Sequence, residues 1–216
     1  MDRLTTAITP VAPFDFELTA GYHTYFQSRY GTDTMEDGVY RRLLDLGDKL
    51  VLASVRSAGT VDAPELELEL QGSELSTADV GLAKERVSWL LGVDQDLAPF
   101  YELGRADQAM AELVERFYGL HLPHTATAFE ALVLAVLGQQ ISTSVARIIR
   151  TLLIETFGPN AEFDGETYYA FPRPESIWAS SPAELHTMKL TQRKSCLLYT
   201  SPSPRDATLS RMSSSA

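Results

Sequence analysis

The sequence predicts an α+β fold in which an antiparallel sheet with some helices comes first and an all-α region follows. Leucine and glutamate alternate strictly over residues 65–70, the period of a half-buried strand. The connections between the expected strands are too short for parallel crossovers, so we expect antiparallel pairing. The helical part is predicted by apolar residues that recur with the helical period from Ser76 onward, and by residues 126–137, which are apolar almost all round.

Three stretches near the N-terminus predict strands. Apolar and acidic residues alternate over residues 14–18. Residues 39–55 predict two strands joined at Gly47-Asp48, a glycine-first pair that suits a type II′ hairpin turn. In residues 65–70 the glutamates form a solvated face rather than a metal site, and the residues expected to face a core are Leu66, Leu68 and Leu70.

Helices are expected after these strands. The first follows Ser76, has Thr77 or Asp79 as its cap and ends at Gly92. Its apolar stripe is Leu82, Val87, Leu90 and Leu91. Two shorter helices follow, at residues 94–103 and 107–118. The last of them has Met110, Leu113, Val114 and Phe117 on one face.

The chain is expected to divide near residue 120, where a stretch containing Gly119 and Pro123 interrupts the helical pattern. We expect an α+β domain at residues 1–120, a partial helical domain at 121–196 and a disordered tail at 197–216. The formal net charge is −11, and all of the excess acidity lies in residues 1–120. Overall charge therefore says little about whether one face of the helical part can meet a polyanion.

In the helical part, residues 126–137 predict a buried central helix and residues 141–157 a second long helix. The side chains expected to point inward from the second helix are Val145, Ile148, Ile149, Leu152 and Leu153, and those expected on its outer side are Arg147 and Arg150. Gly158-Pro159 should end this helix. Pro174 and the Ser181–Glu184 capping box should start two more.

Several classes of protein are excluded by composition. No window is long and apolar enough for a membrane span, and the first residues contain no apolar region typical of a secretory signal. A single cysteine, Cys196, excludes a disulfide framework and a cysteine-rich zinc site. His121 and His124 are expected at the surface rather than on zinc. We expect a cytoplasmic monomer with neither metal nor cofactor.

One polar interruption separates the two apolar helices. It contains Gly138, Gln139, Gln140, Ile141 and Ser142. One interpretation is a helix–helix turn whose amides cap backbone groups; the other is a turn that presents polar side chains to a ligand.

The segment from Phe129 to Arg147, which contains this turn, resembles the start of the helix-hairpin-helix DNA glycosylase domain, and its closest match is the DNA-3-methyladenine glycosylase II type. Three further stretches resemble the same family in the expected order, so that the resemblance covers about residues 13–195. They are Tyr40–Gly47 with Leu50–Val55, Tyr169–Ser176 and Leu185–Lys194.

The resemblance implies base-excision repair: hydrolysis of the N-glycosidic bond of an alkylated purine that has left the stack of duplex DNA. It implies DNA contacts at Gln139, Gln140 and Ser142, with Gln140 at the position of the side chain that fills the gap. It places Tyr22 in the base pocket, where an aromatic face suits a cationic base. The alternative for Tyr22 is a core aromatic residue. Arg147 and Arg150 are either phosphate contacts or part of a solvated helix face.

Two later elements of the family are not found in the printed sequence: a hairpin of the type Leu-Pro-Gly-Ile-Gly and an aspartate beyond it. The family pattern stops after Lys194, and the following run, which includes Asp206, resembles translated adapter sequence of artefactual origin. No catalytic residue is therefore assigned, and we expect this chain to be inactive, although the resemblance implies that its parent is a glycosylase. Two alternatives stay open: a non-catalytic DNA-binding or damage-sensing module of the same fold, and a structural domain in which Gln139 and Gln140 only cap a turn.

Overall fold

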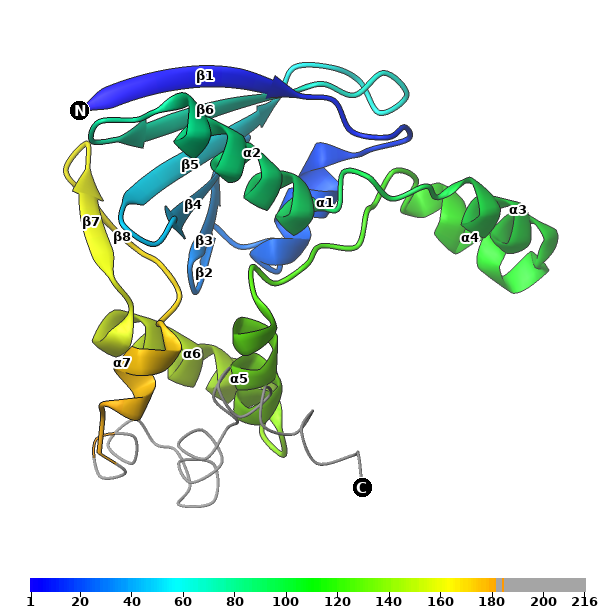
Figure 1. Ribbon diagram of the computed structural model, residues 1–216. Coiled ribbons are helices and arrows are strands. Elements are labelled where there is room, and N and C mark those ends of the chain that lie inside the picture. Colours follow the sequence, from blue (N-terminus) through cyan, green and yellow to red (C-terminus); the bar gives the residue numbers. More distant parts are fainter. Residues whose placement is uncertain (182–183, 185–216) are drawn as a thin grey trace, which may run out of the picture. The chain divides into compact units, whose positions relative to one another are not determined.

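The computed structural model describes residues 1–181 and residue 184, and divides them into two compact units (Figure 1). The first unit contains residues 1–126 and 159–170, and the second contains residues 127–158 and the described residues from 171 onward. This division differs from the predicted boundary at residue 120. Residues 121–126 still belong to the first unit because His121 is fully buried there and Ala126 packs against its core. The predicted tail lies outside the described residues.

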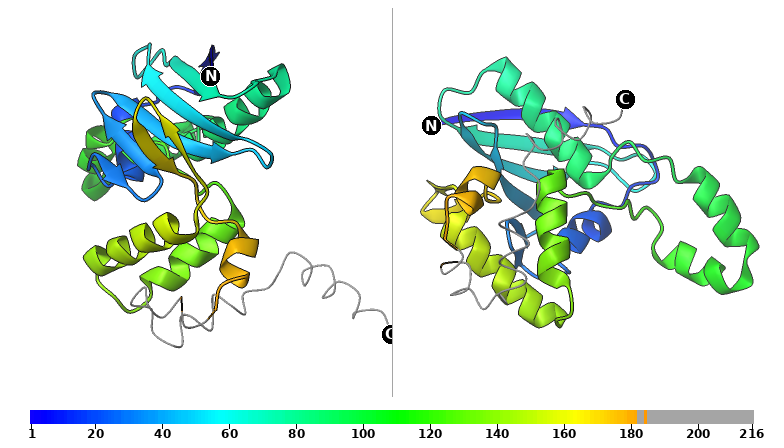
Figure 2. Two further views of the ribbon diagram at one scale, coloured as in Figure 1. Left: turned by 90° about the vertical axis from the view of Figure 1, so that its left-hand side faces the viewer. Right: turned by 60° about the horizontal axis from the view of Figure 1, so that its bottom comes forward.

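The first unit is built on a six-stranded antiparallel sheet with the order β1-β6-β5-β4-β3-β2 (Figures 1 and 2). The strands are β1 Asp2–Ile8, β2 Arg29–Tyr30, β3 Asp33–Glu36, β4 Val39–Asp45, β5 Leu50–Ser57 and β6 Leu66–Gly72. The predicted antiparallel sheet is therefore confirmed, and so is the β4–β5 hairpin, in which Gly47 takes a positive φ of 107°. The predicted inward residues of β6, Leu66, Leu68 and Leu70, are all buried.

The prediction of a strand at residues 14–18 was wrong, because these residues begin the helix α1, Phe16–His23. The side chain of Asp15 accepts a hydrogen bond from the backbone N–H of Leu18 at 2.9 Å, which caps the helix. Phe14 and Phe16 are buried on either side of the cap. Over so few residues, this pattern of burial has the same period of two as a strand. The edge strand β1 was not predicted.

Helix α2, Thr77–Leu91, packs with α1 on one face of the sheet, where the main core lies. Its cap is Ser76 rather than the predicted Thr77 or Asp79: Ser76 and Asp79 form a reciprocal capping box, so Asp79 acts as the third helical residue. Gly92 ends the helix in the left-handed conformation, as its position predicted. The opposite face of the sheet is covered by the hairpin of β7, Asn160–Phe163, and β8, Glu166–Tyr169, through Leu43, Leu52, Phe163 and Ala170.

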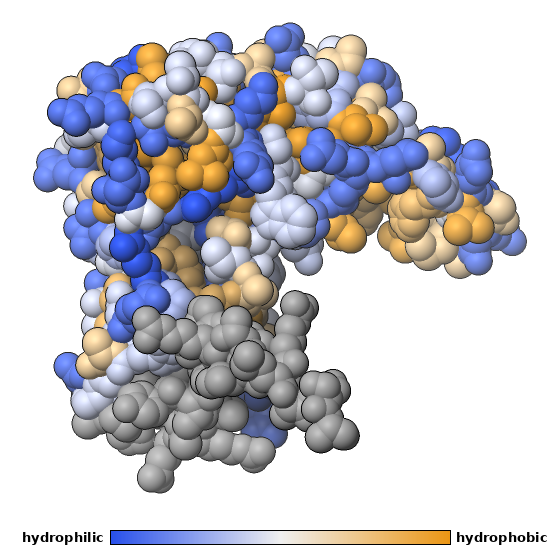
Figure 3. Space-filling view, viewed as in Figure 1, coloured by the Kyte–Doolittle hydropathy of each residue, from blue (hydrophilic) through white to orange (hydrophobic). Residues whose placement is uncertain are grey.

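Helices α3, Ala98–Ala106, and α4, Gln108–Arg116, form a helical hairpin in the first unit. Val114 is buried between them, but the three other residues predicted on its face are 38% to 47% exposed: Met110, Leu113 and Phe117. The α3–α4 hairpin, at the right of Figure 3, accordingly has hydrophobic surface among hydrophilic side chains.

The second unit contains α5, Ala128–Gly138, α6, Thr143–Phe157, and α7, Pro174–Trp178. Pro174 starts α7 as predicted, and Ser181 and Glu184 form the predicted capping box, which lowers the pKa of the Glu184 carboxyl through the backbone N–H of Ser181. The core of this unit consists of Val133, Val136, Leu137, Ile149, Leu153 and Ile177.

Two predictions about these helices were wrong. Helix α5 is not buried all round, because Leu132 is 41% exposed. In α6, Val145 and Ile148 are exposed although they were predicted to point inward, and Arg150 is buried although it was predicted on the outer side. The reason is that the apolar side chains of α6 extend around more of the helix than its buried face, which consists of Ile149, Arg150, Leu153 and Ile154. Among the described residues, no helix is long and apolar enough to cross a membrane.

Candidate nucleic-acid interface

The turn between α5 and α6 is held at both ends by hydrogen bonds. The N–H of Gln139 reaches the carbonyl of Val136 at 3.4 Å, which closes the last turn of α5. The side chain of Ser142 accepts a hydrogen bond from the N–H of Val145 at 3.4 Å and so caps α6. A serine is suited to this position because the first N–H groups of a helix have no acceptor within the helix, and the serine side chain supplies one.

Gln140 lies at the centre of this turn with a φ of +57°. A non-glycine residue in this left-handed region costs about 1 kcal/mol or more, and such conformations gather at functional sites. Gln139 and Gln140 are both exposed, so their amide groups can donate to and accept from a ligand at the surface. The turn thus brings together the three residues predicted to contact DNA, Gln139, Gln140 and Ser142, and the hydroxyl of Ser142 also serves as the helix cap.

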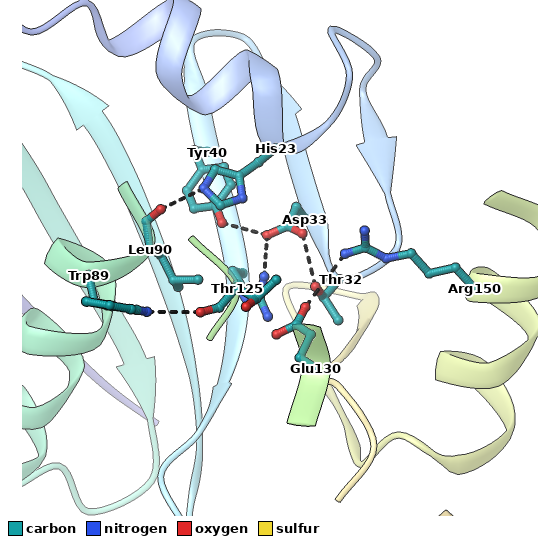
Figure 4. Close-up of polar contacts among 10 residues, drawn as sticks. His23, Thr32, Asp33, Tyr40, Trp89, Leu90, Thr125, Glu130 and Arg150 are labelled. Atoms are coloured by element: carbon teal, nitrogen blue, oxygen red, sulfur yellow. Dashed lines mark hydrogen bonds and ion pairs between the residues drawn. The ribbon is translucent and has the colours of Figure 1, made fainter. Parts of the chain in front are cut away.

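The part of the sequence that contains the turn has no acidic residues. Between Glu130 and Glu155 the chain has no aspartate or glutamate, although its total charge is −11. Arg147 is exposed on α6. Arg150 is neither a phosphate contact nor part of a solvated helix face, because it is buried and its guanidinium lies 3.7 Å from the carboxylate of Glu130 (Figure 4).

Tyr22, the predicted base-pocket residue, lies on α1 of the first unit. Its side chain is 47% exposed, which does not fit the alternative of a core aromatic residue. The ring lies nearly parallel to that of Tyr25, with 6.0 Å between the centroids and 24° between the planes. Tyr25 and Phe26 are half exposed or more and were not predicted as site residues, although the aromatic density of residues 22–30 could have indicated them.

A buried polar network, which the sequence did not predict, lies at β3 and β4, where the ring of Tyr40 is 5.4 Å from that of His23 on α1 (Figure 4). The carboxylate of Asp33 accepts hydrogen bonds from the Tyr40 hydroxyl at 2.6 Å, the Arg42 guanidinium at 2.9 Å and the Thr32 hydroxyl at 3.1 Å. Asp33 and Arg42 are partners on the neighbouring strands β3 and β4. Burial, and secondarily the charge of Asp33, raises the pKa of the Tyr40 phenol well above its ordinary value.

His121 is buried, so the prediction that it lies at the surface was wrong. Its Nδ1 lies 2.6 Å from the carbonyl oxygen of Gly92 and its Nε2 lies 2.9 Å from that of Pro13. These contacts tie the chain after α4 to the end of α2 and to the segment before α1. In the part of the chain that the structure describes, no three histidine, cysteine or acidic side chains are grouped to hold a metal ion. Cys196 lies outside that part.

No family model matches the chain. It is 39% identical over 103 residues to the "DNA-3-methyladenine glycosylase" of Bacillus subtilis (strain 168), which is 48% of this chain and 34% of that protein. It is 30% identical over 183 residues to the "Probable bifunctional transcriptional activator/DNA repair enzyme AlkA" of Mycobacterium tuberculosis (strain CDC 1551 / Oshkosh), which is 84% of this chain and 36% of that protein. The chain thus spans about a third of the length of these relatives.

The fold is similar to that of the solved 3-methyladenine DNA-glycosylase from Archaeoglobus fulgidus. The TM-score is 0.75 at 23% identity, over 90% of this chain and 65% of that one. The ordered motifs and the relatives above support assignment of the chain to the helix-hairpin-helix DNA glycosylase superfamily, and the fold agrees with it. The Bacillus subtilis relative is named as a glycosylase of the 3-methyladenine type, and the Mycobacterium tuberculosis relative as a DNA repair enzyme.

Proposed function

We propose that the protein to which these residues belong excises alkylated purines, of the 3-methyladenine and 7-methylguanine type, from duplex DNA by hydrolysing the N-glycosidic bond. The observation that carries the proposal is the exposed α5–α6 turn with Gln140 in the left-handed conformation. It is supported by one relative named as a DNA-3-methyladenine glycosylase and another named as a DNA repair enzyme.

The turn supplies what base flipping needs from the protein. A base whose sugar bond is to be cleaved has to leave the stack, which costs a few kcal/mol and less for a damaged base. In this proposal the side chain of Gln140 fills the gap and its amide bonds to the base left behind, while Gln139 and the start of α6 meet the DNA backbone. Arg147 is the exposed cation nearest in sequence to this turn and adds a phosphate contact.

Tyr22 supplies an aromatic face for the extruded base. Alkylation at a ring nitrogen leaves a purine positively charged, and a cation is attracted to the negative face of an aromatic ring. The same charge weakens the glycosidic bond, so an enzyme for such bases needs less catalytic power than one for neutral lesions. The partner is therefore damaged double-stranded DNA, and the proposed monomer needs neither metal nor cofactor.

The family aspartate and the glycine hairpin are not in the printed sequence, so we assign no catalytic residue and expect the 216-residue chain itself to release no base. This favours a second candidate function for the chain alone, namely DNA binding without catalysis. If the chain binds DNA in this way, its affinity for a duplex should fall as the salt concentration rises from about 20 to about 200 mM, and fluorescence anisotropy measures that affinity. No binding at the lowest salt would exclude it.

A chimera tests the glycosylase proposal. The chain up to Lys194 is joined to the corresponding C-terminal segment of the Bacillus subtilis relative, in which the family resemblance leads us to expect a hairpin and an aspartate. The readout is release of 3-methyladenine and 7-methylguanine from methylated duplex DNA. The matched controls are the donor segment alone and the chimera with the donor aspartate changed to asparagine. A chimera that folds, binds the duplex and releases no base would refute the proposal.

A further inference from the structure

Three histidines meet the carbonyl groups at the C-terminal end of α2. One histidine lies on α1, and the other two lie in the segment that follows α4. The nitrogen-to-oxygen distances are 2.9 Å from His23 to Leu90, 2.6 Å from His121 to Gly92 and 2.7 Å from His124 to Trp89. The last carbonyls of a helix have no partner within it and carry a partial negative charge, so they suit N–H donors and cations.

Residues 119–126, called the strap here, are bonded along this end of α2. The side-chain amide of Gln95 accepts from the N–H of Leu122 at 3.0 Å and donates to its carbonyl at 2.7 Å. The indole N–H of Trp89 donates to the carbonyl of Thr125 at 3.0 Å (Figure 4), and its ring stacks on that of His124 with 4.3 Å between the centroids. The strap therefore has a defined position against α2, and its end leads into α5.

His121 differs from the other two histidines because each of its ring nitrogens meets a carbonyl oxygen. Its Nδ1 lies 2.6 Å from the oxygen of Gly92 and its Nε2 lies 2.9 Å from that of Pro13. A carbonyl oxygen accepts a hydrogen bond and cannot donate one, whereas a neutral imidazole has one N–H and one lone pair. Both contacts are hydrogen bonds only when both nitrogens carry a proton, which makes the ring an imidazolium cation.

The surroundings of His121 provide for a buried charge. The residue is 0% exposed, so both hydrogen bonds have to come from the protein. Gly92 is the C-cap of the 15-residue helix α2, and a histidine cation is stabilised at a helix C-terminus, most strongly where it is partly buried. The ring also meets the edge of Phe14 at 4.8 Å, and the N–H of His121 donates to the hydroxyl of Thr19 at 3.1 Å. Two carbonyl dipoles, one of them at the negative end of α2, thus take the place of a counter-ion.

The titratable groups on the elements packed around these histidines have other partners or lie at the surface. On β4, Tyr40 faces His23, and burial raises the pKa of its phenol well above the ordinary value, so it stays uncharged. Asp15 caps α1, and Arg86 of α2 donates to the carbonyl of Asp45. The acidic residues between α2 and α3 are exposed, namely Asp94 and Asp96.

We propose that His121 is held as an imidazolium in the folded chain and fastens the strap, and the segment before α1, to the end of α2 in a proton-dependent manner. When the ring loses one proton, one nitrogen turns a lone pair toward a carbonyl oxygen and the junction weakens. A histidine in an unfolded chain loses this proton near pH 6.5, its ordinary value. Because the folded chain retains the proton, the stabilisation is complete below about pH 6.5 and is lost as the pH rises further.

The first test is nitrogen-15 NMR of the histidine rings in the 216-residue chain near pH 7. We expect His121 to show two protonated nitrogens. His124 is the internal control, because its Nδ1 meets the carbonyl of Trp89 and a neutral ring satisfies that contact. We expect His124 to be mostly neutral at the same pH. A neutral ring at His121 would overturn the proposal, and this measurement needs no variant.

The second test compares urea unfolding of the wild type, His121→Gln and His124→Gln at about pH 6.5 and about pH 7.5. One proton bound more tightly by the folded state changes the folding constant by up to about tenfold per pH unit. Between these two pH values the folding constants of the wild type and of His124→Gln should therefore fall at least about threefold more than that of His121→Gln, whose amide offers N–H donors without a charge. The same pH dependence in all three proteins would refute the role of His121.

Discussion

Removal of the Asp33 carboxylate should be among the most destabilising single changes in the first unit. Asp33 and Arg42 are 1% and 3% exposed, and their charges lie 2.9 Å apart. Asp33→Ala removes an acceptor used by three donors and leaves the Arg42 guanidinium buried without that counter-charge. Breaking a buried pair in this way costs about 3–5 kcal/mol, a large share of a total stability of about 5–15 kcal/mol.

Two further variants show whether the charge itself is the cause. Tyr40→Phe removes one hydrogen bond to a charged acceptor and should cost about 1.5–3 kcal/mol. Asp33→Ala combined with Arg42→Met removes both charges and should recover part of the loss, because an apolar replacement of a buried pair is often neutral or stabilising.

The assay is urea unfolding followed by the fluorescence of Trp89, which lies on α2 of the first unit, in a Trp178→Phe background. The reasoning is refuted if Asp33→Ala costs less than about 1 kcal/mol, or if the double variant is less stable than Asp33→Ala alone.

Two other variants test the turn and a helix cap. Gln140→Gly relieves the left-handed conformation, so stability should stay equal or rise by about 1 kcal/mol, while base release by the chimera should fall about tenfold because the gap is no longer filled. Unchanged release would favour a purely structural turn. Asp79 has its pKa lowered to about 2 by hydrogen bonds from Lys49 and Ser76. It therefore contributes stability above its unfolded pKa of about 3.9, and this contribution is lost as the pH falls toward 2. Asp79→Asn should lower the thermal midpoint at pH 6 but have little effect near pH 2; an equal difference at both pH values would contradict this.

Local patterns in the sequence were sufficient to predict much of the first unit. Alternation over Leu66–Leu70, the glycine-first turn at Gly47 and the helix end at Gly92 each depend on neighbours in sequence, and each is confirmed. Residues 14–18 were misassigned because a five-residue alternation is too short to distinguish a strand from the start of a capped helix.

Features that depend on distant partners could not be predicted in this way. Asp33 meets Arg42 only through the register of β3 and β4, and His121 is buried by the carbonyls of Pro13 and Gly92. The burial of Arg150 follows from Glu130 on another helix. Within the candidate site, the sequence predicted the turn at Gln139–Ser142 and the half-exposed Tyr22. The aromatic density of residues 22–30 was the one signal for Tyr25 and Phe26, and the pattern of residues did not reveal the hydrogen bonds that accompany their positive φ values.

Base release by the chimera is the most direct test of the central claim. This claim is that the α5–α6 turn and Tyr22 belong to an alkylpurine glycosylase. The chimera should release 7-methylguanine and 3-methyladenine from methylated duplex DNA, and both the donor segment alone and the aspartate-to-asparagine control should not. A folded chimera that binds the duplex but releases neither base would contradict the claim.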